Sequence, residues 1–398
     1  IVLQLLQVPC NAANFFVVNK NDSGIGSLRQ AITDANADNS ATANSPHVID
    51  ATTISDTIKL ASALPDINNH IIINGTSFGS PIIISGENLH RVFYISSGKI
   101  AKLNYLTIIK GYLSGNNSGA GIENYGILTI NNCSFYNNNV SYFYGGAISN
   151  EPGAKCNINN CDFKHNYSES EGGAISSDGV LCIKNSTLSY NSARFGGGAI
   201  CLGGLSGVND TIMSCILTNN WSTDRSGGAL IILGGIDNSV IINCSFSNNF
   251  STSVNSTSGQ GNGGSIFYLG NSMQIKSCSF TNEHAISSGN QIGGSIYISS
   301  NNATITNSTF KGNKAKQGGA IASIGNNINI TNCTFSADSA SNGSGGAIYI
   351  EGGSMTVTNS TLYGNVASTY GGGIYNTVGS LTINNTLIIG NTATTGND

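Results

Sequence analysis

Charged side chains are scarce in this chain of 398 residues, where Asp, Glu, Lys and Arg together make up only 9%. The formal net charge of -4 provides no basic surface for a polyphosphate, which excludes nucleic acid as a partner on electrostatic grounds. After the first sixteen residues, no stretch approaches the roughly 18 consecutive apolar residues of a membrane-spanning helix. Residues 121–391 also lack the 3.6-residue apolar period of helices, so a helical architecture is excluded there.

Patterns that indicate catalysis or metal binding are sparse as well. The five histidines share no repeat position, and no Ser-His-Asp arrangement follows from their spacing. Cys156, Cys161 and His165 resemble half of a zinc site. However, Cys161 belongs to a repeated column of small residues, and Cys156 aligns with leucines of neighbouring repeats, so we expect both to pack in the core. We therefore assign no catalytic residue, no metal ligand and no cofactor.

Glycine is abundant, with 51 residues, and much of it recurs in one repeated turn. The turn has the form Gly-Gly-Ala-Ile and returns every 25 to 36 residues. A period of this size indicates a solenoid, in which each repeat buries its apolar face only by stacking on its neighbours. The turns end at Ile122, Ile148, Ile175, Ile200, Leu230, Ile266, Ile296, Ile321, Ile348 and Ile374.

The second half of each repeat indicates which solenoid forms. A small residue is followed two positions later by an aromatic or aliphatic residue, and the pattern closes on an Asn three positions after that. Residues 128–130 and their equivalents alternate apolar and polar with period two, which is typical of strands. Short strands with Gly and Asn at the corners predict an all-β fold, a right-handed parallel β-helix with about three strands per turn. Asn332 lies in a column that we expect to form an amide ladder at a buried corner.

Six of the ten cysteines fall in the small-residue column, where Ser and Thr substitute for them. Cysteines stacked on adjacent rungs would have Cα atoms about 4.8 Å apart, which is within disulfide range. Three cysteines in succession, Cys215, Cys244 and Cys278, cannot all pair within their run. We therefore expect most cysteines to be small buried thiols.

Four segments follow one another along the chain. Residues 1–16 are apolar and resemble the tail of a secretory signal peptide, although they could instead form an apolar first strand that caps the coil. Residues 17–47 are expected to form an N-terminal cap with a short helix that begins at the N-cap Ser27. Residues 48–118 are irregular first rungs, and residues 119–398 are the regular repeats, which we expect to be truncated at the C-terminus.

Two parts of the sequence resemble known families. Residues 26–32 (GSLRQAI), with LPDI at 64–67 and IIING at 71–75 behind them, resemble the Cys-Ser-Leu-Arg-Glu-Ala type N-terminal domain of secreted bacterial β-helix proteins, although Gly26 and Gln30 replace that family's Cys and Glu. The repeats of residues 121–391 resemble the Gly-Gly-Ala-Ile and Phe-x-x-Asn motifs of chlamydial polymorphic outer-membrane proteins, which are autotransporter passengers that act as adhesins.

The resemblance implies a secreted or cell-surface adhesin, a monomeric passenger that mediates attachment to a host-cell surface protein or glycan. Membrane attachment would then depend on a C-terminal anchor or barrel outside the given sequence. Recognition is expected where the repeats differ, in the loops that precede the Gly-Gly turns, because variable loops on a rigid scaffold commonly carry binding sites. The binding residues that we predict there are Tyr142, Phe143, Tyr144, Trp221 and Arg225.

Two other functions stay open. Many right-handed β-helices cleave polysaccharides, so the chain could be a polysaccharide lyase or a glycoside hydrolase. Such a site needs converging carboxylates, and Glu151 and Asp178 follow the turn Ile by three residues in adjacent repeats. A structural surface protein without a ligand is the other alternative.

Overall fold

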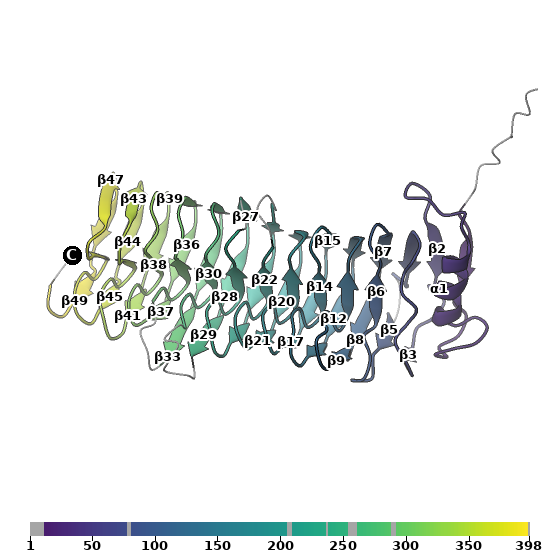
Figure 1. The fold of residues 1–398 in the computed structure, drawn as a ribbon. Helices are drawn as coiled ribbons and strands as arrows, with labels where there is room; N and C mark the ends of the chain where they lie inside the picture. Colours follow the sequence, from purple (N-terminus) through teal and green to yellow (C-terminus); the bar gives the residue numbers. More distant parts are fainter. Residues whose placement is uncertain are drawn as a thin grey trace, which may run out of the picture.

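The computed structural model describes residues 12–77, 81–204, 209–235, 238–253, 261–287 and 292–396. It is a right-handed parallel β-solenoid of about 12 turns, with α1 (Leu28–Ala37) as the one helix in these ranges (Figure 1). At about 4.8 Å per rung the stack is roughly 55 Å long. The predicted fold class is confirmed. Each regular turn contributes four strands, however, because a two-residue strand forms where the sequence indicated a corner.

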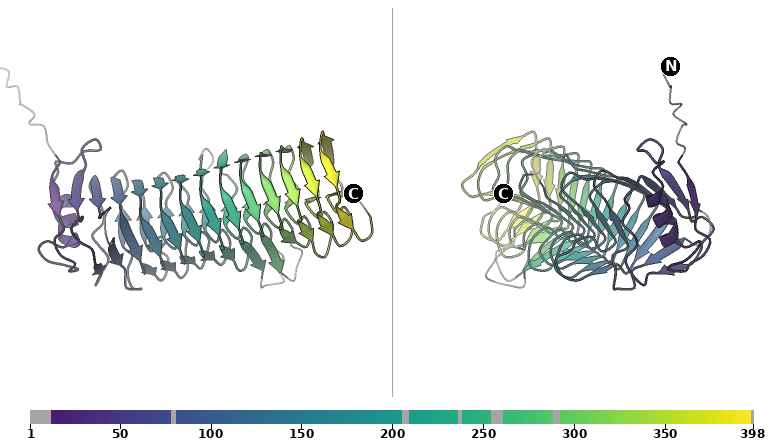
Figure 2. Two further views of the ribbon diagram at one scale, coloured as in Figure 1. Left: turned by 180° about the vertical axis from the view of Figure 1, so that it is seen from behind. Right: turned by 45° about the vertical axis from the view of Figure 1, so that its right-hand side comes forward.

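The first sheet has 14 strands and runs the length of the rod (Figures 1 and 2). Its strands alternate between exposed and buried positions, so that Leu128 and Ile130 of one rung point into the core. In order, the strands are β1 (Asn14–Phe16), β2 (His47–Asp50), β4 (Ile71–Asn74), β7 (Ile100–Asn104), β11 (Ile127–Asn131), β15 (Lys155–Asn159), β19 (Val180–Lys184), β23 (Thr211–Met213), β27 (Ser239–Ile242), β31 (Met273–Lys276), β35 (Ala303–Thr306), β39 (Ile328–Thr331), β43 (Ser354–Thr358) and β47 (Ser380–Asn384).

The second sheet has 13 strands and supplies the aromatic column of the core. Phe280 and Phe310 stack with ring centroids 4.8 Å apart, and Phe310 and Phe335 follow at 4.7 Å, so each ring covers the face of the next. The strands are β3 (Thr57–Lys59), β5 (Ile82–Ser85), β8 (Leu106–Ile109), β12 (Ser134–Tyr136), β16 (Asp162–Lys164), β20 (Thr187–Ser189), β24 (Ile216–Thr218), β28 (Ser245–Ser247), β32 (Ser279–Thr281), β36 (Thr309–Lys311), β40 (Thr334–Ser336), β44 (Thr361–Tyr363) and β48 (Leu387–Ile389).

The third sheet has 11 short strands, which follow the closing residue of each repeat. Its first position faces outward and its second position inward, as at Asn139 and Val140. The strands are β9 (Tyr112–Leu113), β13 (Asn139–Val140), β17 (Tyr167–Ser168), β21 (Ser192–Ala193), β25 (Trp221–Ser222), β29 (Phe250–Ser253), β33 (His284–Ser287), β37 (Lys314–Ala315), β41 (Ser339–Ala340), β45 (Val366–Ala367) and β49 (Thr392–Ala393).

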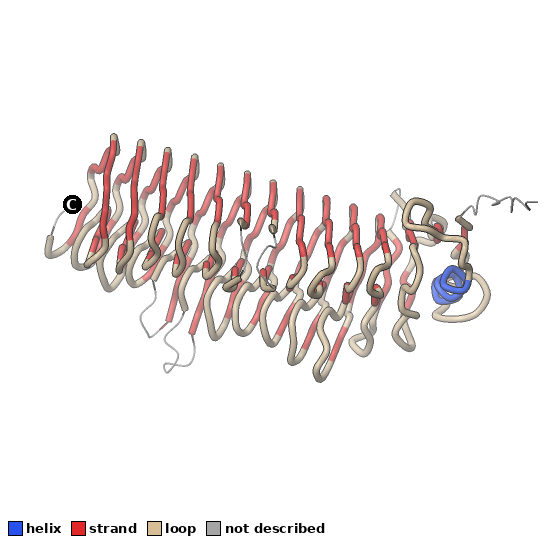
Figure 3. The backbone as a smooth tube through the Cα atoms, turned by 45° about the horizontal axis from the view of Figure 1, so that its top comes forward, coloured by secondary structure: helices blue, strands red, loops and turns tan. Residues whose placement is uncertain are grey.

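The fourth sheet has 11 strands, and all of them except β6 begin at the Ile or Leu that ends a glycine turn of the regular repeats. Strands of successive turns stack in rows along the rod (Figure 3). The turn requires glycine: Gly145 has a φ of +65°, and a Cβ on Gly146 would lie 2.3 Å from the Gly173 carbonyl oxygen of the next rung. The strands are β6 (Phe93–Ile95), β10 (Ile122–Asn124), β14 (Ile148–Asn150), β18 (Ile175–Ser177), β22 (Ile200–Leu202), β26 (Leu230–Ile232), β30 (Ile266–Tyr268), β34 (Ile296–Ile298), β38 (Ile321–Ser323), β42 (Ile348–Ile350) and β46 (Ile374–Asn376).

The N-terminal end of the rod is covered by α1 (Figure 1). Ser27 is its N-cap, because the Ser27 Oγ accepts the Gln30 backbone N–H at 3.2 Å. Leu28, Ile32 and two alanines of the helix are buried. The first strand begins at Asn14, within the range expected for a leader peptide, and pairs in parallel with β2. The remainder of that range, residues 1–11, lies outside the described residues.

Inside the corner between the second and third sheets runs a ladder formed by the closing residues. The Asn166 backbone N–H and Nδ2 both donate to Asn191 Oδ1 at 3.0 Å, and Asn166 Nδ2 also donates to the Phe135 carbonyl oxygen at 3.0 Å. We call this column the closing ladder. Two of its ten positions are not Asn, contrary to the repeat pattern. The members are Asn138, Asn166, Asn191, Asn220, Asn249, Glu283, Asn313, Asp338, Asn365 and Asn391.

The column that contains Asn332 is different. Asn332 is exposed and has a φ of +55°, and its Nδ2 donates to Asn307 Oδ1 at 3.2 Å. The expectation of a buried corner was therefore wrong for this column. Its asparagines are retained because Asn tolerates the left-handed backbone that turns the chain between the first and second sheets.

We predict that replacing Asn220 of the closing ladder by Ala destabilises the protein by about 3 kcal/mol or more. The change removes the acceptor of the buried Asn191 backbone N–H, one of the two acceptors of Asn191 Nδ2, and the side-chain donor to the Leu188 carbonyl oxygen. Asn157→Ala, on the exposed face of β15, should change stability by no more than about 0.5 kcal/mol. Chemical denaturation of both variants tests this, and equal midpoints would contradict the role of the ladder.

The nine cysteines among the described residues are free thiols. Burial raises the pKa of Cys161 to about 12 and that of Cys156 further, so little thiolate forms at neutral pH. Cys182, which faces outward from β19, is only half-buried. Alkylation of the native protein should therefore label Cys182 first, and alkylation after denaturation without reductant should label all nine. Mass spectrometry that finds linked pairs would overturn the packing role.

Candidate functional site

The outer face of the fourth sheet carries the candidate site. The middle residue of each three-residue strand points away from the core. It is nevertheless buried in nine of the 11 strands, all but β6 and β46, because residues of the loops on both sides of the sheet surround it. A second apolar cluster, separate from the main core, forms on this outer face and includes Ile231, Phe267, Tyr297 and Tyr349. The loops and this face together form a groove parallel to the rod axis.

Three adjoining cavities make up the groove. The first, of about 230 Å³, is lined by Glu123, Glu151, Asp178 and neighbouring residues, and the second, of about 130 Å³, by Glu171, Asp178 and Cys201 among others. The third measures about 250 Å³. Tyr144, Ser176 and Asp178 line both the first and the second cavity, and Leu233 lines both the second and the third. The three cavities therefore adjoin one another in a row from β10 to β34, over about 29 Å at the rung spacing.

The first two cavities are acidic. Burial raises the pKa of Glu171 and of Asp178, which extends the pH range over which each can hold a proton. A Cβ on Gly203 would lie 2.4 Å from Asp178 Oδ1, so the glycine leaves room for that carboxyl. Cys201 Sγ donates to Glu171 Oε2 at 3.6 Å. The pKa of this thiol is raised by its burial, so it is a poor nucleophile.

At the N-terminal end of the groove, Glu123 is held by Arg91, with 2.6 Å between Glu123 Oε2 and Arg91 Nη2. Burial raises the pKa of Glu123, whereas the charge of Arg91 lowers it. Next to this pair, the Ser149 hydroxyl donates to Glu151 Oε1 at 2.6 Å. The two carboxyls lie on adjacent rungs and can accept hydrogen bonds from the hydroxyl groups of a ligand.

The third cavity is apolar with a polar rim. Ile231, Leu233, Phe267, Leu269 and Tyr297 line it, and the Phe267 and Tyr297 rings stack with centroids 5.3 Å apart. Arg225, Ser226 and Asn262 complete one wall. An apolar floor with a few polar groups around it is typical of sites that bind organic ligands.

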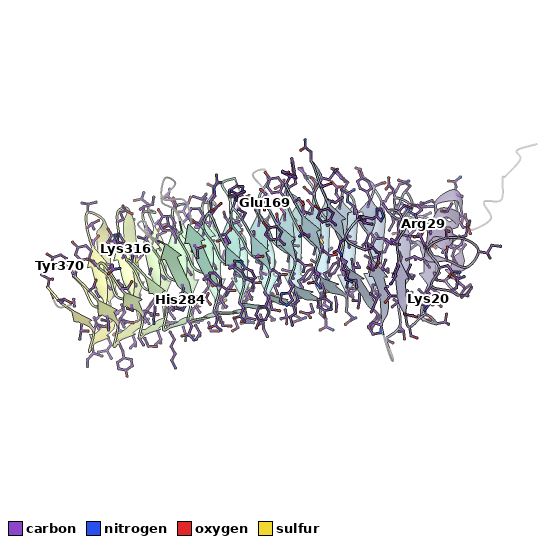
Figure 4. All side chains as sticks on the ribbon, turned by 90° about the horizontal axis from the view of Figure 1, so that it is seen from below. Lys20, Arg29, Glu169, His284, Lys316 and Tyr370 are labelled. Atoms are coloured by element: carbon purple, nitrogen blue, oxygen red, sulfur yellow. The ribbon has the colours of Figure 1, made fainter. Side chains whose placement is uncertain are left out.

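Ion pairs fix the loop that separates the groove from the third sheet. Arg194 bridges Glu169 and Asp224, at 2.6 and 2.7 Å (Figure 4 labels Glu169). Arg225 lies 3.9 Å from Glu171 and over the Phe195 ring. Arg194 is therefore engaged with carboxylates on the two adjacent rungs and Arg225 with a carboxylate two rungs away, which orders the rim before a ligand binds.

The structure separates the binding residues that the sequence predicted together. Tyr144 lines the first and second cavities, Phe143 the first and Arg225 the third. Tyr142 is 67% exposed and lines none of these three cavities. Trp221 lies on β25 of the third sheet, stacked on the Phe250 ring at 5.9 Å and away from the groove. Glu151 and Asp178, the carboxylates considered for an enzyme, do meet in the first cavity.

Sequence reasoning missed the floor of the groove. The floor is the column directly after each turn Ile, and its residue types change along the rod from acidic through small to aromatic. The variable column was visible in the repeat alignment, but period-two patterning does not show that surrounding loops cover the outer face of a strand. The column is Glu123, Ser149, Ser176, Cys201, Ile231, Phe267, Tyr297, Ala322, Tyr349 and Tyr375.

No group of three or more His, Cys, Asp or Glu residues is arranged to hold a metal ion within the described ranges. Cys156 and Cys161 are buried in the main core, as the packing interpretation predicted. No helix in the described part of the chain is long and apolar enough to cross a membrane.

Comparison with known proteins gives one family match and several structural matches. Residues 307–324 match the repeat of the Chlamydia polymorphic membrane proteins. This short match agrees with the resemblance seen in the repeats, and the structure shows that the matched segment is part of a β-solenoid. No curated protein matches the chain in sequence.

Similar solved structures are catalytic domains of GH87 α-1,3-glucanases. One in complex with nigerose is 14% identical with a TM-score of 0.53, over 95% of this chain and 68% of that one. A variant in complex with tetrasaccharides gives 14% and 0.54 over the same shares of the two chains. The enzyme from Streptomyces thermodiastaticus gives 15% and 0.48, over 96% and 69%. At 14% identity, the first two matches, with TM-scores above 0.5, establish the β-helix fold alone.

Proposed function

We propose that this protein is a secreted or cell-surface adhesin-like β-helix that attaches to a glycan chain on a host cell through the groove of the fourth sheet. The observation that carries the proposal is the row of adjoining cavities along the groove, which is acidic at Glu123 and Asp178 and aromatic at Phe267 and Tyr297. Sugars present hydroxyl groups to carboxylates and apolar C–H faces to aromatic side chains, so both halves suit one glycan chain.

Charge favours a neutral glycan over an acidic one. The arginines at the groove, Arg91, Arg194 and Arg225, each contact a carboxylate. Glu151 and Asp178 have no ion pair with a basic side chain among the described residues. A polyanionic chain would therefore meet unneutralised carboxylates, and like charges in contact oppose binding.

Display on a surface is supported by the match to a Chlamydia polymorphic membrane protein repeat, and by the resemblance of the N-terminal cap to secreted β-helix proteins. The chain also suits attachment mechanically, because its stacked coils form an elongated rod (Figure 2), a stiff scaffold for a groove parallel to the rod axis. We propose that a single copy binds the glycan, since all three cavities are lined by one chain.

We predict that Leu233→Arg blocks the junction of the second and third cavities and weakens attachment at least about tenfold, because a long charged side chain fills a groove shaped for a ligand. Tyr144→Ala should weaken attachment by a smaller factor. Val378→Arg introduces the same side chain at a position that is 86% exposed and outside the groove, and it should bind normally. Cell attachment and glycan titration measure both effects, and equal binding by the two arginine variants would place the ligand elsewhere.

Glycan cleavage is a second candidate, favoured by one specific observation. Glu171 and Asp178 line the same cavity, and burial raises the pKa of both carboxyls, as a general acid requires. A panel of neutral glycans that includes an α-1,3-glucan should be tested for release of reducing ends. If this function holds, Glu171→Gln and Asp178→Asn abolish release and retain binding. If the protein only attaches, the wild type binds the glycan and releases nothing.

A further inference from the structure

Two carboxyls replace amides in the closing ladder, and both are fully buried. Glu283 and Asp338 stand at positions where eight other rungs have Asn. An Asn amide offers one acceptor oxygen and an N–H donor group to its neighbours. A carboxylate offers acceptors only, whereas a protonated carboxylic acid again offers an acceptor and a donor. The hydrogen-bond partners of a carboxyl in the ladder therefore indicate whether it carries a proton.

Asp338 reproduces the hydrogen bonding of an Asn only if one of its two carboxyl oxygens carries a proton. Its Oδ1 accepts the Asn313 backbone N–H at 2.9 Å and Asn313 Nδ2 at 2.7 Å, as an Asn Oδ1 does elsewhere. Its Oδ2 is buried without a hydrogen-bond partner. On the adjacent rungs, Nδ2 of Asn313 and of Asn365 donates to a backbone carbonyl oxygen of the rung before.

The same ladder geometry gives Asp338 Oδ2 the carbonyl oxygen of Phe310 as its neighbour, by analogy with the Asn rungs. Two oxygens without a hydrogen between them repel each other, and burial removes the water that could separate them. A proton on Oδ2 converts this contact into a hydrogen bond. The protonated side chain then reproduces the bonding of the asparagine that it replaces.

Glu283 is one methylene longer than Asn, and its surroundings in the sequence differ accordingly. Its Oε2 accepts the Asn249 backbone N–H at 2.9 Å, and its Oε1 lies 3.4 Å from Asn249 Nδ2. The two Gly-Gly turns that carry Ser in place of Ala belong to the rungs of Asn249 and Glu283, at Ser265 and Ser295. Both serines are fully buried, so small polar groups accompany the buried carboxyl.

We propose that Glu283 and Asp338 are protonated within the folded ladder and act as a pH-sensitive device, which stabilises the surrounding coils in acid and weakens them as the medium becomes alkaline. This inference rests on the ladder alone and is independent of the groove and its ligand. It concerns the rungs from β29 to β45, which lie in the C-terminal half of the rod (Figure 1).

The direction of the pH effect follows from the proton balance. Burial raises the pKa of Glu283 and of Asp338 to about 8 in the folded protein, from ordinary values of 4.5 and 3.8. Between about pH 4 and pH 8, the folded state holds protons that the unfolded state has released. Their contribution to stability is therefore complete below about pH 4 and is lost as the pH rises through about 8. Within that range each group changes the unfolding constant by up to about tenfold per pH unit.

The groups that face the two carboxyls do not titrate in this range. Asp338 faces the side chain of Asn313, and Glu283 faces Asn249 and Ser265. On the outer side of the third sheet, His284 pairs in register with Lys314 (Figure 4 labels His284). Burial lowers the pKa of His284, which gives a pH effect of opposite sign. His284 is present in the wild type and in the isosteric carboxyl variants, so its contribution cancels when their stabilities are compared.

Infrared spectroscopy detects the proposed protons directly. At pH 6 exposed carboxyls are ionised, so the C=O stretch of a protonated carboxylic acid reports the buried ones. We expect this band in the wild type, a weaker band in D338N and in E283Q, and the weakest band in the double variant, where the buried Asp210 remains because burial raises its pKa to about 7. A wild type without the band at pH 6, in a sample that is folded by circular dichroism, would overturn the proposal.

Denaturation between pH 5 and pH 8 is the second measurement. Relative to D338N, the wild-type unfolding constant should rise by up to about tenfold per pH unit, because the amide does not titrate. The control D66N makes the same change at the exposed Asp66 and should keep a constant ratio to the wild type. A constant ratio for D338N would overturn the proposal for Asp338, and E283Q tests Glu283 in the same way if D338N fails to fold.

Discussion

In-register stacking of coils is the constraint on which this structure depends. Each residue lies about 4.8 Å from its equivalent on the next rung, so the side chains of one column must pack against or hydrogen-bond to one another. Phenylalanines satisfy this requirement by stacking, as Phe280, Phe310 and Phe335 do, and asparagines satisfy it by donating and accepting along the column. A residue that cannot interact with a copy of its neighbour interrupts a column, and the structure shows where such interruptions are accommodated.

Periodicity also explains why the fold could be predicted from the sequence. Ten copies of one turn fix the repeat, period-two alternation fixes the strands, and stacking leaves little choice of register. The predicted burial of the Asn332 column was wrong, because the sequence does not show how deeply a repeated column is buried. Asn332 and Asn220 are both repeated asparagines, yet the first is exposed with a positive φ and the second is fully buried. A recurring residue type identifies a column, but it does not show whether the side chains of that column face the core or the solvent.

The candidate site was only partly predictable for a related reason. Loop residues such as Tyr144 and Arg225 attract attention because they are aromatic or charged, and the structure places both at the groove. Trp221 has the same chemistry but lies on another sheet, stacked on Phe250. The floor residues Cys201 and Ile231 resemble ordinary core residues in sequence. Their role becomes visible only when the loops are folded over the outer face of the fourth sheet.

A column of stacked side chains tolerates a gradual change of residue type from rung to rung better than an abrupt one. A rod with uniform backbone geometry can therefore differ in chemistry from one end to the other. The floor of the groove changes from Glu123 through Ser176 to Phe267, each step placing side chains of similar size or polarity next to one another. The closing ladder has no such freedom, because its side chains are enclosed. There, Asp338 reproduces the hydrogen bonding of an Asn only when its second carboxyl oxygen carries the proton that an amide would have supplied as an N–H. The same stacking rule thus allows residue types to vary along the groove floor and requires a proton on Asp338 inside the closing ladder.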